Sequence, residues 1–295
     1  MTGNMTQANS IATAVEASTE IPTWISGLLI AIVAFVVIIG GIKSIGSVAG
    51  RVVPAMALGY VLVAFIMLII NAEQVPAAFM QIITYAFGLE QAAGGIAGYS
   101  VLAAIRFGVA RGLFSNEAGQ GSTAIAHAAA QTDDPVYQGE IAMLGAVIDT
   151  LIICTMTALV ILSVKGSFPG PDGTTVEYAW QSTLQGAQVT TAVFNQWMPF
   201  GGLFIAIALA LFAFTTILGW SYYMEQASTY LFGDWIAKPM RFVWVAMVFV
   251  GALQPIDFIW RFGDIANASM AFPNLIAILL LSPVVVAMAR EGGRL

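Results

Sequence analysis

Long apolar runs separated by short polar connections make up most of this chain. In hydrocarbon every backbone polar group must bond within its own segment, so an uncharged run of about 18 residues or more predicts a spanning helix. The uncharged runs are Ile25–Ile42, Val52–Ala72, Pro199–Met224 and Ile265–Ala289. Two further stretches are less clean: Ile141–Val164 contains Asp149, and Phe242–Ile256 needs neighbouring residues to cross fully. Thr6–Ala17 is expected to be the end of another helix.

One stretch, from about Ile96 to about Gln131, is too long and too polar in its middle for one helix. Its centre holds Glu117 and three glycines. Glycine weakens a helix by about 1 kcal/mol against alanine, and an ionisable group at the bilayer centre costs roughly 2.5–3.5 kcal/mol. The stretch therefore predicts a discontinuous helix, with one half ending near Phe114 and the other starting near Ser122.

Unwound backbone at membrane depth exposes carbonyls to a cation or an ammonium, and a half-helix N-terminus favours an anion. An α-amino acid zwitterion fits both ends. The alternative is a kinked structural helix in which Glu117 pairs with Arg111. Asp149 has two interpretations as well: a cation ligand or proton carrier, or a hydrogen-bond partner that holds the patch at Asn116 and Glu117 in place.

Two residues of the run Pro199–Met224 share a helix face, since Thr216 and Trp220 are one turn apart. They are candidates for the wall of a small-substrate pocket. A threonine pair such as Thr215 and Thr216 also commonly bonds back to the preceding turn, and from these residues alone that plainer interpretation is favoured.

Composition narrows the class of protein. Of 295 residues 59% are hydrophobic and 9% charged, against about 25% charged in soluble domains, so most of the exterior is expected to face lipid. The single cysteine, Cys154, excludes a disulfide framework or multi-cysteine metal site. His127 is the only histidine, and nothing orients it toward Ser115 as in a hydrolase. We therefore expect neither an enzyme nor, at a net charge of −6, a nucleic-acid partner.

Basic residues indicate orientation. The pairs Lys43 and Arg51, Lys238 and Arg241, and Arg290 and Arg294 fall on one side when spans are counted, with the first two pairs placed in loops. The positive-inside rule makes that side cytoplasmic. Lys165–Gln196, with its Pro-Gly-Pro-Asp-Gly turn, is then an outer loop.

The sequence resembles the alanine/glycine:cation symporter family over nearly its whole length. The agreement lies in strings at 112–122 (Gly-Leu-Phe-Ser-Asn-Glu-Ala-Gly-Gln-Gly-Ser), 126–130 (Ala-His-Ala-Ala-Ala), 149–162 (Asp-Thr-Leu-Ile-Ile-Cys-Thr-Met-Thr-Ala-Leu-Val-Ile-Leu), 215–223 (Thr-Thr-Ile-Leu-Gly-Trp-Ser-Tyr-Tyr), 251–257 (Gly-Ala-Leu-Gln-Pro-Ile-Asp), 273–277 (Pro-Asn-Leu-Ile-Ala) and 3–10 (Gly-Asn-Met-Thr-Gln-Ala-Asn-Ser).

The resemblance implies an all-α, polytopic membrane protein with a leucine-transporter-type (APC superfamily) fold of two inverted five-helix repeats. Residues 1–90 are expected to be the remainder of the first repeat, comprising the end of its third helix, its fourth and fifth helices and an outer connection. Residues 91–295 are expected to be the second repeat, with its first helix broken. The first repeat is then incomplete, so the chain is expected to be an N-terminally truncated fragment.

Carried over by position, the resemblance also implies a site. Substrate contacts are expected from Phe114, Ser115 and Asn116, from Thr216 and Trp220 on a facing helix, and more weakly from Asn4, Gln7 and Asn9. Sodium is expected to bind the Phe212 carbonyl and the hydroxyls of Thr215 and Thr216. With the resemblance, the functional interpretation of the threonine pair is therefore favoured over the structural one. Glu117 and Asp149 are expected to form a coupling network.

The implied function is sodium-coupled symport of alanine or glycine across the cytoplasmic (inner) membrane, with no cofactor beyond the coupling ion. The bulk of Trp220 suits a small substrate. Two alternatives stay open: a proton-coupled amino-acid carrier using Glu117 or Asp149, and a non-transporting membrane fragment.

Overall fold

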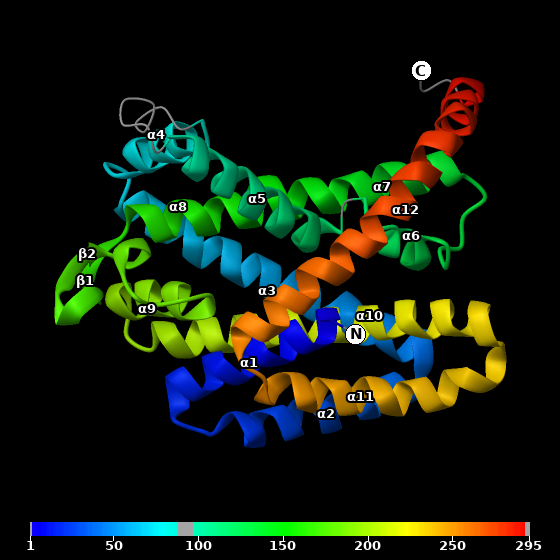
Figure 1. Cartoon of the computed structure of the whole chain (residues 1–295), viewed down its shortest axis with the longest axis horizontal. Coiled ribbons are helices and arrows are strands. Elements are labelled where there is room, and N and C mark those ends of the chain that lie inside the picture. Colours follow the sequence, from blue (N-terminus) through cyan, green and yellow to red (C-terminus); the bar gives the residue numbers. More distant parts are fainter. Residues whose placement is uncertain (1, 88–96, 118, 293–295) are drawn as a thin grey trace. The chain divides into compact units, whose positions relative to one another are not determined.

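The computed structural model describes residues 2–87, 97–117 and 119–292, and within them the chain is almost entirely helical (Figure 1). The helices are α1 (Thr2–Thr19), α2 (Thr23–Ile39), α3 (Gly41–Ile70), α4 (Val75–Ala86), α5 (Ala97–Asn116), α6 (Ser122–His127), α7 (Pro135–Val147), α8 (Thr155–Ser163), α9 (Ala187–Trp197), α10 (Gly201–Phe232), α11 (Ala237–Leu253) and α12 (Ile256–Glu291). A π-helical segment, Ile148–Cys154, joins α7 to α8, and short 3-10 turns cover Pro171–Gly173, Ala179–Gln181 and Asp234–Ile236.

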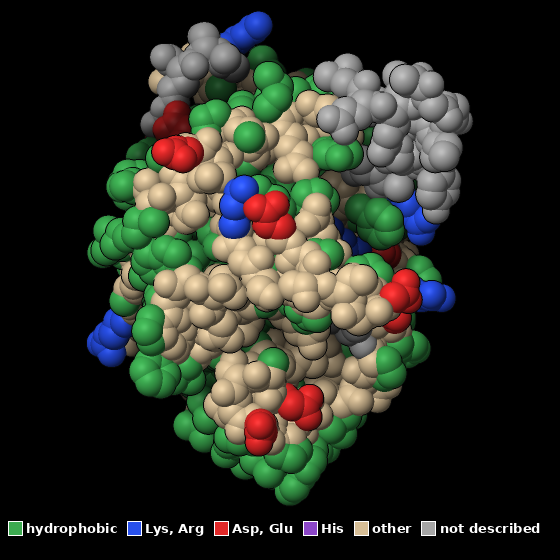
Figure 2. Space-filling model, turned by 90° about the vertical axis from the view of Figure 1, so that its left-hand side faces the viewer, with side chains coloured by type: hydrophobic (Ala, Val, Ile, Leu, Met, Phe, Trp, Pro, Cys, Tyr) green, Lys and Arg blue, Asp and Glu red, His purple; other side chains and the backbone are tan. Residues whose placement is uncertain are grey.

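The apolar runs predict most of the spans. The exception is Ile25–Ile42, which forms the shorter apolar helix α2 of 17 residues. Among the described residues, five helical stretches are long and apolar enough to cross a membrane: Gly41–Ile70, Pro135–Ser163, Gly201–Phe232, Asp234–Leu253 and Asp257–Glu291. Many large apolar side chains of these stretches are exposed, Leu58, Leu279 and Leu280 among them. On the face drawn in Figure 2 the charged side chains are few and scattered. An all-α, multi-pass membrane protein is therefore confirmed.

Two predicted loops are wrong. Lys43 and Arg51 lie within α3, and Lys238 and Arg241 lie within the first turns of α11. A helix continues past the hydrocarbon when its polar end residues reach the headgroup region, so a charge marks the membrane edge rather than the helix end. In α11, Arg241 is held by both carboxylate oxygens of Glu225, at 2.7 and 2.6 Å.

The chain forms two compact units, which are described separately. The first comprises Met1–Gln81 and Met156–Gly263. Here α1 packs against α10, α11 and α2 (Figure 1). The contact between α1 and α11 is close, because a Cβ on Gly251 of α11 would lie 2.4 Å from the Met5 Cα of α1. Small residues permit such approaches between membrane helices. The fully buried side chains include Trp244, Phe194, Ile217 and Leu218.

The polar connection Lys165–Gln196 belongs to this unit and holds a small hairpin. Strands β1 (Lys165–Pro169) and β2 (Thr175–Tyr178) pair antiparallel, with Phe168 opposite Val176. The predicted turn lies between them, with Asp172 and Gly173 at φ values of 55° and 74°. Lys165 pairs with Glu177 across the hairpin at 2.8 Å, and a hydrogen bond to this carboxylate raises the pKa of the Lys165 ammonium.

The second unit comprises Ile82–Thr155 and Asp264–Leu295. It contains α5, α6, α7, the π-helical segment and most of α12. The π-helical segment continues α7 and lies against α5. These units are groups of residues in mutual contact, whereas the expected repeats at residues 1–90 and 91–295 are defined by internal symmetry. The repeats remain a prediction.

Candidate functional site

The predicted break in the long polar stretch is confirmed. Helix α5 ends at Asn116, two residues beyond the expected Phe114, and α6 begins at the expected Ser122. Between them Glu117, Gly119 and Gly121 have φ values of 55°, 73° and 79°. Left-handed backbone suits glycine, and a non-glycine residue there is a strained exception. The break therefore depends on its glycines and concentrates strain at Glu117.

Glu117 turns back onto the second half-helix. Its Oε2 accepts hydrogen bonds from the Ser122 hydroxyl at 2.6 Å and from the Thr123 hydroxyl at 3.0 Å. The sequence predicted that the start of this half-helix faces an anion. The carboxylate of Glu117 itself contacts the first residues of α6, so the anion at this position is a side chain of the protein.

Two amide side chains, one from α12 and one from the break itself, hold the break in place. Asn274 of α12 donates from Nδ2 to the Gly119 carbonyl at 2.9 Å, and its Oδ1 would lie 2.7 Å from a Cβ on Gly121. Gln120 donates to the Leu113 carbonyl at 2.9 Å. The Gly119 carbonyl, one of the unwound carbonyls that the sequence offered to a cation, thus already accepts a hydrogen bond. Sequence reasoning missed Asn274, whose only signal was its place in the string at 273–277.

Two hydrogen bonds connect the end of α5 to the segment around Asp149. The Ser115 hydroxyl donates to Asp149 Oδ2 at 2.6 Å, and Asn116 Nδ2 donates to the Thr150 hydroxyl at 3.0 Å. Both partners lie in the π-helical segment, a rare geometry that often occurs at functional sites. The structural interpretation of Asp149 predicted such a contact, although the partner is Ser115 rather than Asn116 or Glu117. Phe114 is half-buried beside them.

The predicted sodium ligands lie together on α10. The hydroxyls of Thr215 and Thr216 both donate to the Phe212 carbonyl, at 2.9 and 3.1 Å. This is the back-bonded arrangement that the plainer interpretation predicts. A hydroxyl that donates still offers lone pairs, so the two hydroxyl oxygens retain the chemistry that a cation requires.

The remaining predicted residues lie on α1 and α10. Trp220 is 8% exposed, and its ring covers Gly3, where a Cβ would lie 2.5 Å away. Asn4 is buried and donates to the Trp244 carbonyl at 3.0 Å. Asn9 is buried too and donates to the Gln254 carbonyl at 2.8 Å, while Gln7 is half-buried. Asn4 and Asn9 thus bond to the α11 side, whereas Trp220 meets α1 at Gly3.

The predicted set is divided between the two units. Phe114, Ser115, Asn116, Glu117 and Asp149 belong to the second unit. The residues of α1 and α10 belong to the first. Within each unit the structure gathers a polar cluster, one at the break and one at the threonine pair.

The apolar spans define a multi-pass helical membrane protein, and the stretch from α5 to α6 adds a discontinuous helix to it. A family model, the sodium:alanine symporter family, matches residues 1–291. The chain belongs to this family, which confirms the resemblance.

Named relatives agree with the family. The chain is 42% identical to the sodium/alanine symporter AgcS of Methanococcus maripaludis, over 97% of this chain and 60% of the relative. It is 38% identical to the sodium/proton-dependent alanine carrier protein of Bacillus sp. strain PS3, over 93% of this chain and 62% of the relative. It is 35% identical to the amino-acid carrier protein AlsT of Bacillus subtilis, over 98% of this chain and 58% of the relative. The chain spans about three fifths of the length of these relatives.

Proposed function

We propose that this chain is part of a secondary active transporter that carries alanine, and also glycine, together with sodium across the cytoplasmic membrane. The observation that carries the proposal is the break between α5 and α6, in a chain whose family match covers residues 1–291. A discontinuous helix at membrane depth is a device by which carriers bind a small polar substrate away from lipid.

The proposed substrate surface is the end of α5. Ser115 and Asn116 present a hydroxyl and an amide that are fixed by Asp149 and Thr150, and Phe114 adds an apolar wall. Fixed polar groups bind a ligand without a further ordering cost. Trp220, Thr216, Asn4, Gln7 and Asn9, on α10 and α1 of the first unit, are proposed as further substrate contacts, and the bulk of Trp220 suits a small side chain.

Sodium is proposed to travel as a second substrate at Phe212, Thr215 and Thr216. Hard cations prefer oxygen ligands, and these three residues bring two hydroxyl oxygens and one carbonyl oxygen to one place on α10. Glu117 and Asp149 are proposed to couple the substrate surface to the neighbouring helix through their hydrogen bonds. The leucine-transporter-type inverted repeats, with a boundary near residue 90, form part of this proposal.

Uptake by proteoliposomes tests the proposal. The protein is reconstituted, and accumulation of radiolabelled alanine is followed under an inward sodium gradient, with glycine and leucine as competitors. We expect accumulation above that of protein-free liposomes, competition by glycine, and no effect of leucine. Accumulation that follows an imposed proton gradient and ignores sodium would replace sodium coupling with the proton-coupled alternative. Helical, incorporated protein without accumulation under either gradient would overturn transport by this chain.

A further inference from the structure

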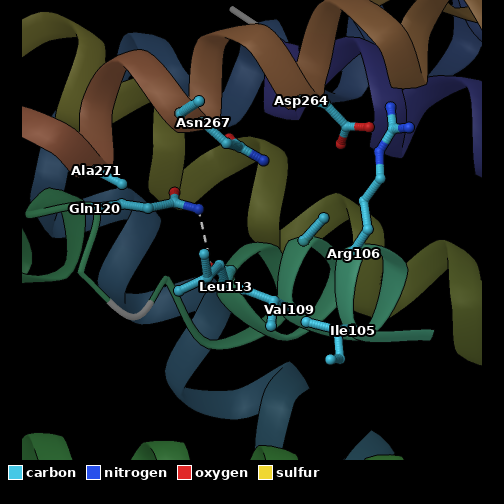
Figure 3. A pocket seen from close by; sticks show the side chains of 10 residues that line it. Ile105, Arg106, Val109, Leu113, Gln120, Asp264, Asn267 and Ala271 are labelled. Atoms are coloured by element: carbon cyan, nitrogen blue, oxygen red, sulfur yellow. Dashed lines mark hydrogen bonds between the residues drawn. The ribbon is translucent and has the colours of Figure 1, made fainter. Parts of the chain in front are cut away.

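A pocket of about 310 Å³ lies in the second unit between α5, the break and α12 (Figure 3). The volume is at the lower end of the range for small-molecule sites. Apolar side chains form its walls, and polar side chains occupy its ends. Its lining residues are Ile105, Arg106, Val109, Ala110, Leu113, Gln120, Asp264, Asn267, Ala268 and Ala271.

Gln120 presents an unmatched acceptor to this pocket. Its Nε2 donates to the Leu113 carbonyl at 2.9 Å, and a flipped amide would place two oxygens against each other. The orientation of the Gln120 amide is therefore fixed, with Oε1 as the atom that does not face Leu113. Gln120 is 5% exposed, and its Oε1 has no hydrogen-bond partner among the described residues. A buried acceptor without a donor destabilises the fold, so this position favours a ligand that donates.

Asn267 presents a second acceptor. It is 9% exposed, and its Oδ1 likewise lacks a partner within the described part of the chain. Figure 3 shows the Asn267 and Gln120 side chains approaching the same space from α12 and from the break. Asn267 lies one helical turn after Asp264 and one before Ala271, so all three share the pocket face of α12.

The other end of the pocket carries charge. Arg106 points toward Asp264 (Figure 3), and Asp264 already pairs with Arg111. Two guanidinium groups beside one carboxylate leave a positive balance, which repels a free cation and attracts an anionic group. The start of α6 does not compete for that anion, because Glu117 already bonds there.

We propose that this pocket is a second amino-acid site, for the zwitterion of an α-amino acid with a small apolar side chain. Its ammonium donates to Gln120 Oε1 and Asn267 Oδ1, its carboxylate meets Arg106, and its side chain contacts Leu113 and Ala271. The inference rests on the proposed function for the class of ligand. It adds a place of binding whose lining contains none of the residues 114–116.

Ligand-dependent stability of the protein in lipid nanodiscs tests the site. Thermal unfolding is followed with increasing alanine or valine, and with alaninamide and propionate, which lack the carboxylate and the ammonium respectively. We expect the two amino acids to raise the melting temperature and the two analogues to have no effect. Isothermal titration on the same samples gives the affinity.

Three variants separate this site from the proposed transport site. Asn267→Leu removes an unpaired buried acceptor, so we expect unchanged or higher stability without ligand and at least a tenfold loss of affinity. Arg106→Gln should lose affinity for amino acids likewise. Ser115→Ala, the matched control at the end of α5, should abolish sodium-driven uptake and keep pocket binding.

The outcomes are distinguishable. Unchanged affinity in Asn267→Leu or Arg106→Gln would overturn the second site, as would a wild-type protein that no amino acid stabilises, because water alone then occupies the pocket. Loss of binding in Ser115→Ala with full binding in Asn267→Leu would assign all binding to the end of α5. Pocket binding without any uptake would remove the transport proposal and leave the second site standing.

Discussion

The Ser115 hydroxyl donates a hydrogen bond of 2.6 Å to the Asp149 carboxylate. This bond joins the last turn before the break to a π-helical segment 34 residues later in the chain. It connects the proposed substrate surface to an ionisable group in the next span. The two interpretations of Asp149 therefore become separable by substitution.

Asp149→Asn keeps an oxygen acceptor for Ser115 but removes the negative charge. Because the acceptor is retained, we expect the melting temperature to stay near that of the wild type. Loss of the charge should reduce sodium-driven alanine uptake by about tenfold, a typical size for coupling between two sites. Asp149→Leu should lower both quantities. Uptake in Asp149→Asn equal to the wild-type rate would leave Asp149 with a structural role alone.

Gly121→Ala should destabilise the break. Gly121 has a φ of 79°, and an added Cβ would lie 2.7 Å from Asn274 Oδ1. The left-handed conformation costs an alanine about 1–2 kcal/mol, and the contact with Asn274 adds to it. The free energy of unfolding in detergent measures the loss.

Gly112→Ala is the matched control for Gly121→Ala, because a Cβ on Gly112 meets nothing within 4 Å. It should raise the free energy of unfolding by up to about 1 kcal/mol, since alanine favours the helix. Equal effects of the two substitutions would contradict the requirement for left-handed backbone at Gly121.

Gly251→Ala should weaken the contact between α1 and α11. Its Cβ would lie 2.4 Å from the backbone of Met5, and overpacking of this kind costs about 1–3 kcal/mol. Thermal unfolding compares it with Gly219→Ala on α10, where a Cβ meets nothing within 4 Å. A smaller loss at Gly251 than at Gly219 would show that α1 does not approach α11 this closely.

Thr216→Val should raise the sodium concentration needed for half-maximal uptake. Removing one oxygen from a charged partner costs about 1.5–3 kcal/mol, which corresponds to about tenfold or more in affinity. Thr216→Ser retains the hydroxyl and should stay near the wild type. Sodium titrations of uptake are the measurement, and the proposed ligand role fails if valine and serine give the same curve.

Much of this architecture could be predicted because membranes leave the chain few alternatives. The uncharged run Pro199–Met224 is helical from Gly201 onward, as hydrocarbon requires. The break could be predicted as well, since glycine and Glu117 conflict with an uninterrupted apolar helix. Its observed ends, Asn116 and Ser122, lie within two residues of the predicted ends.

The hydrogen-bond partners of the break could not be predicted from the sequence. Hydrophobicity carries no information on which residue meets the Gly119 carbonyl, and Asn274 lies 155 residues away. The π-helical geometry at Asp149 leaves the apolar pattern unchanged. Gln120 and Asn267 looked like isolated polar residues until the fold placed both at one pocket. Such contacts depend on tertiary structure, which one sequence does not show.

The hydrogen bonds of Glu117 to Ser122 and Thr123 have a consequence for the shape of the break. They span five and six residues of chain and therefore tie the end of α5 to the start of α6. Asn274 adds a second link, from α12 to the Gly119 carbonyl. The break is thus cross-linked both from within and from a helix more than 150 residues later in the chain.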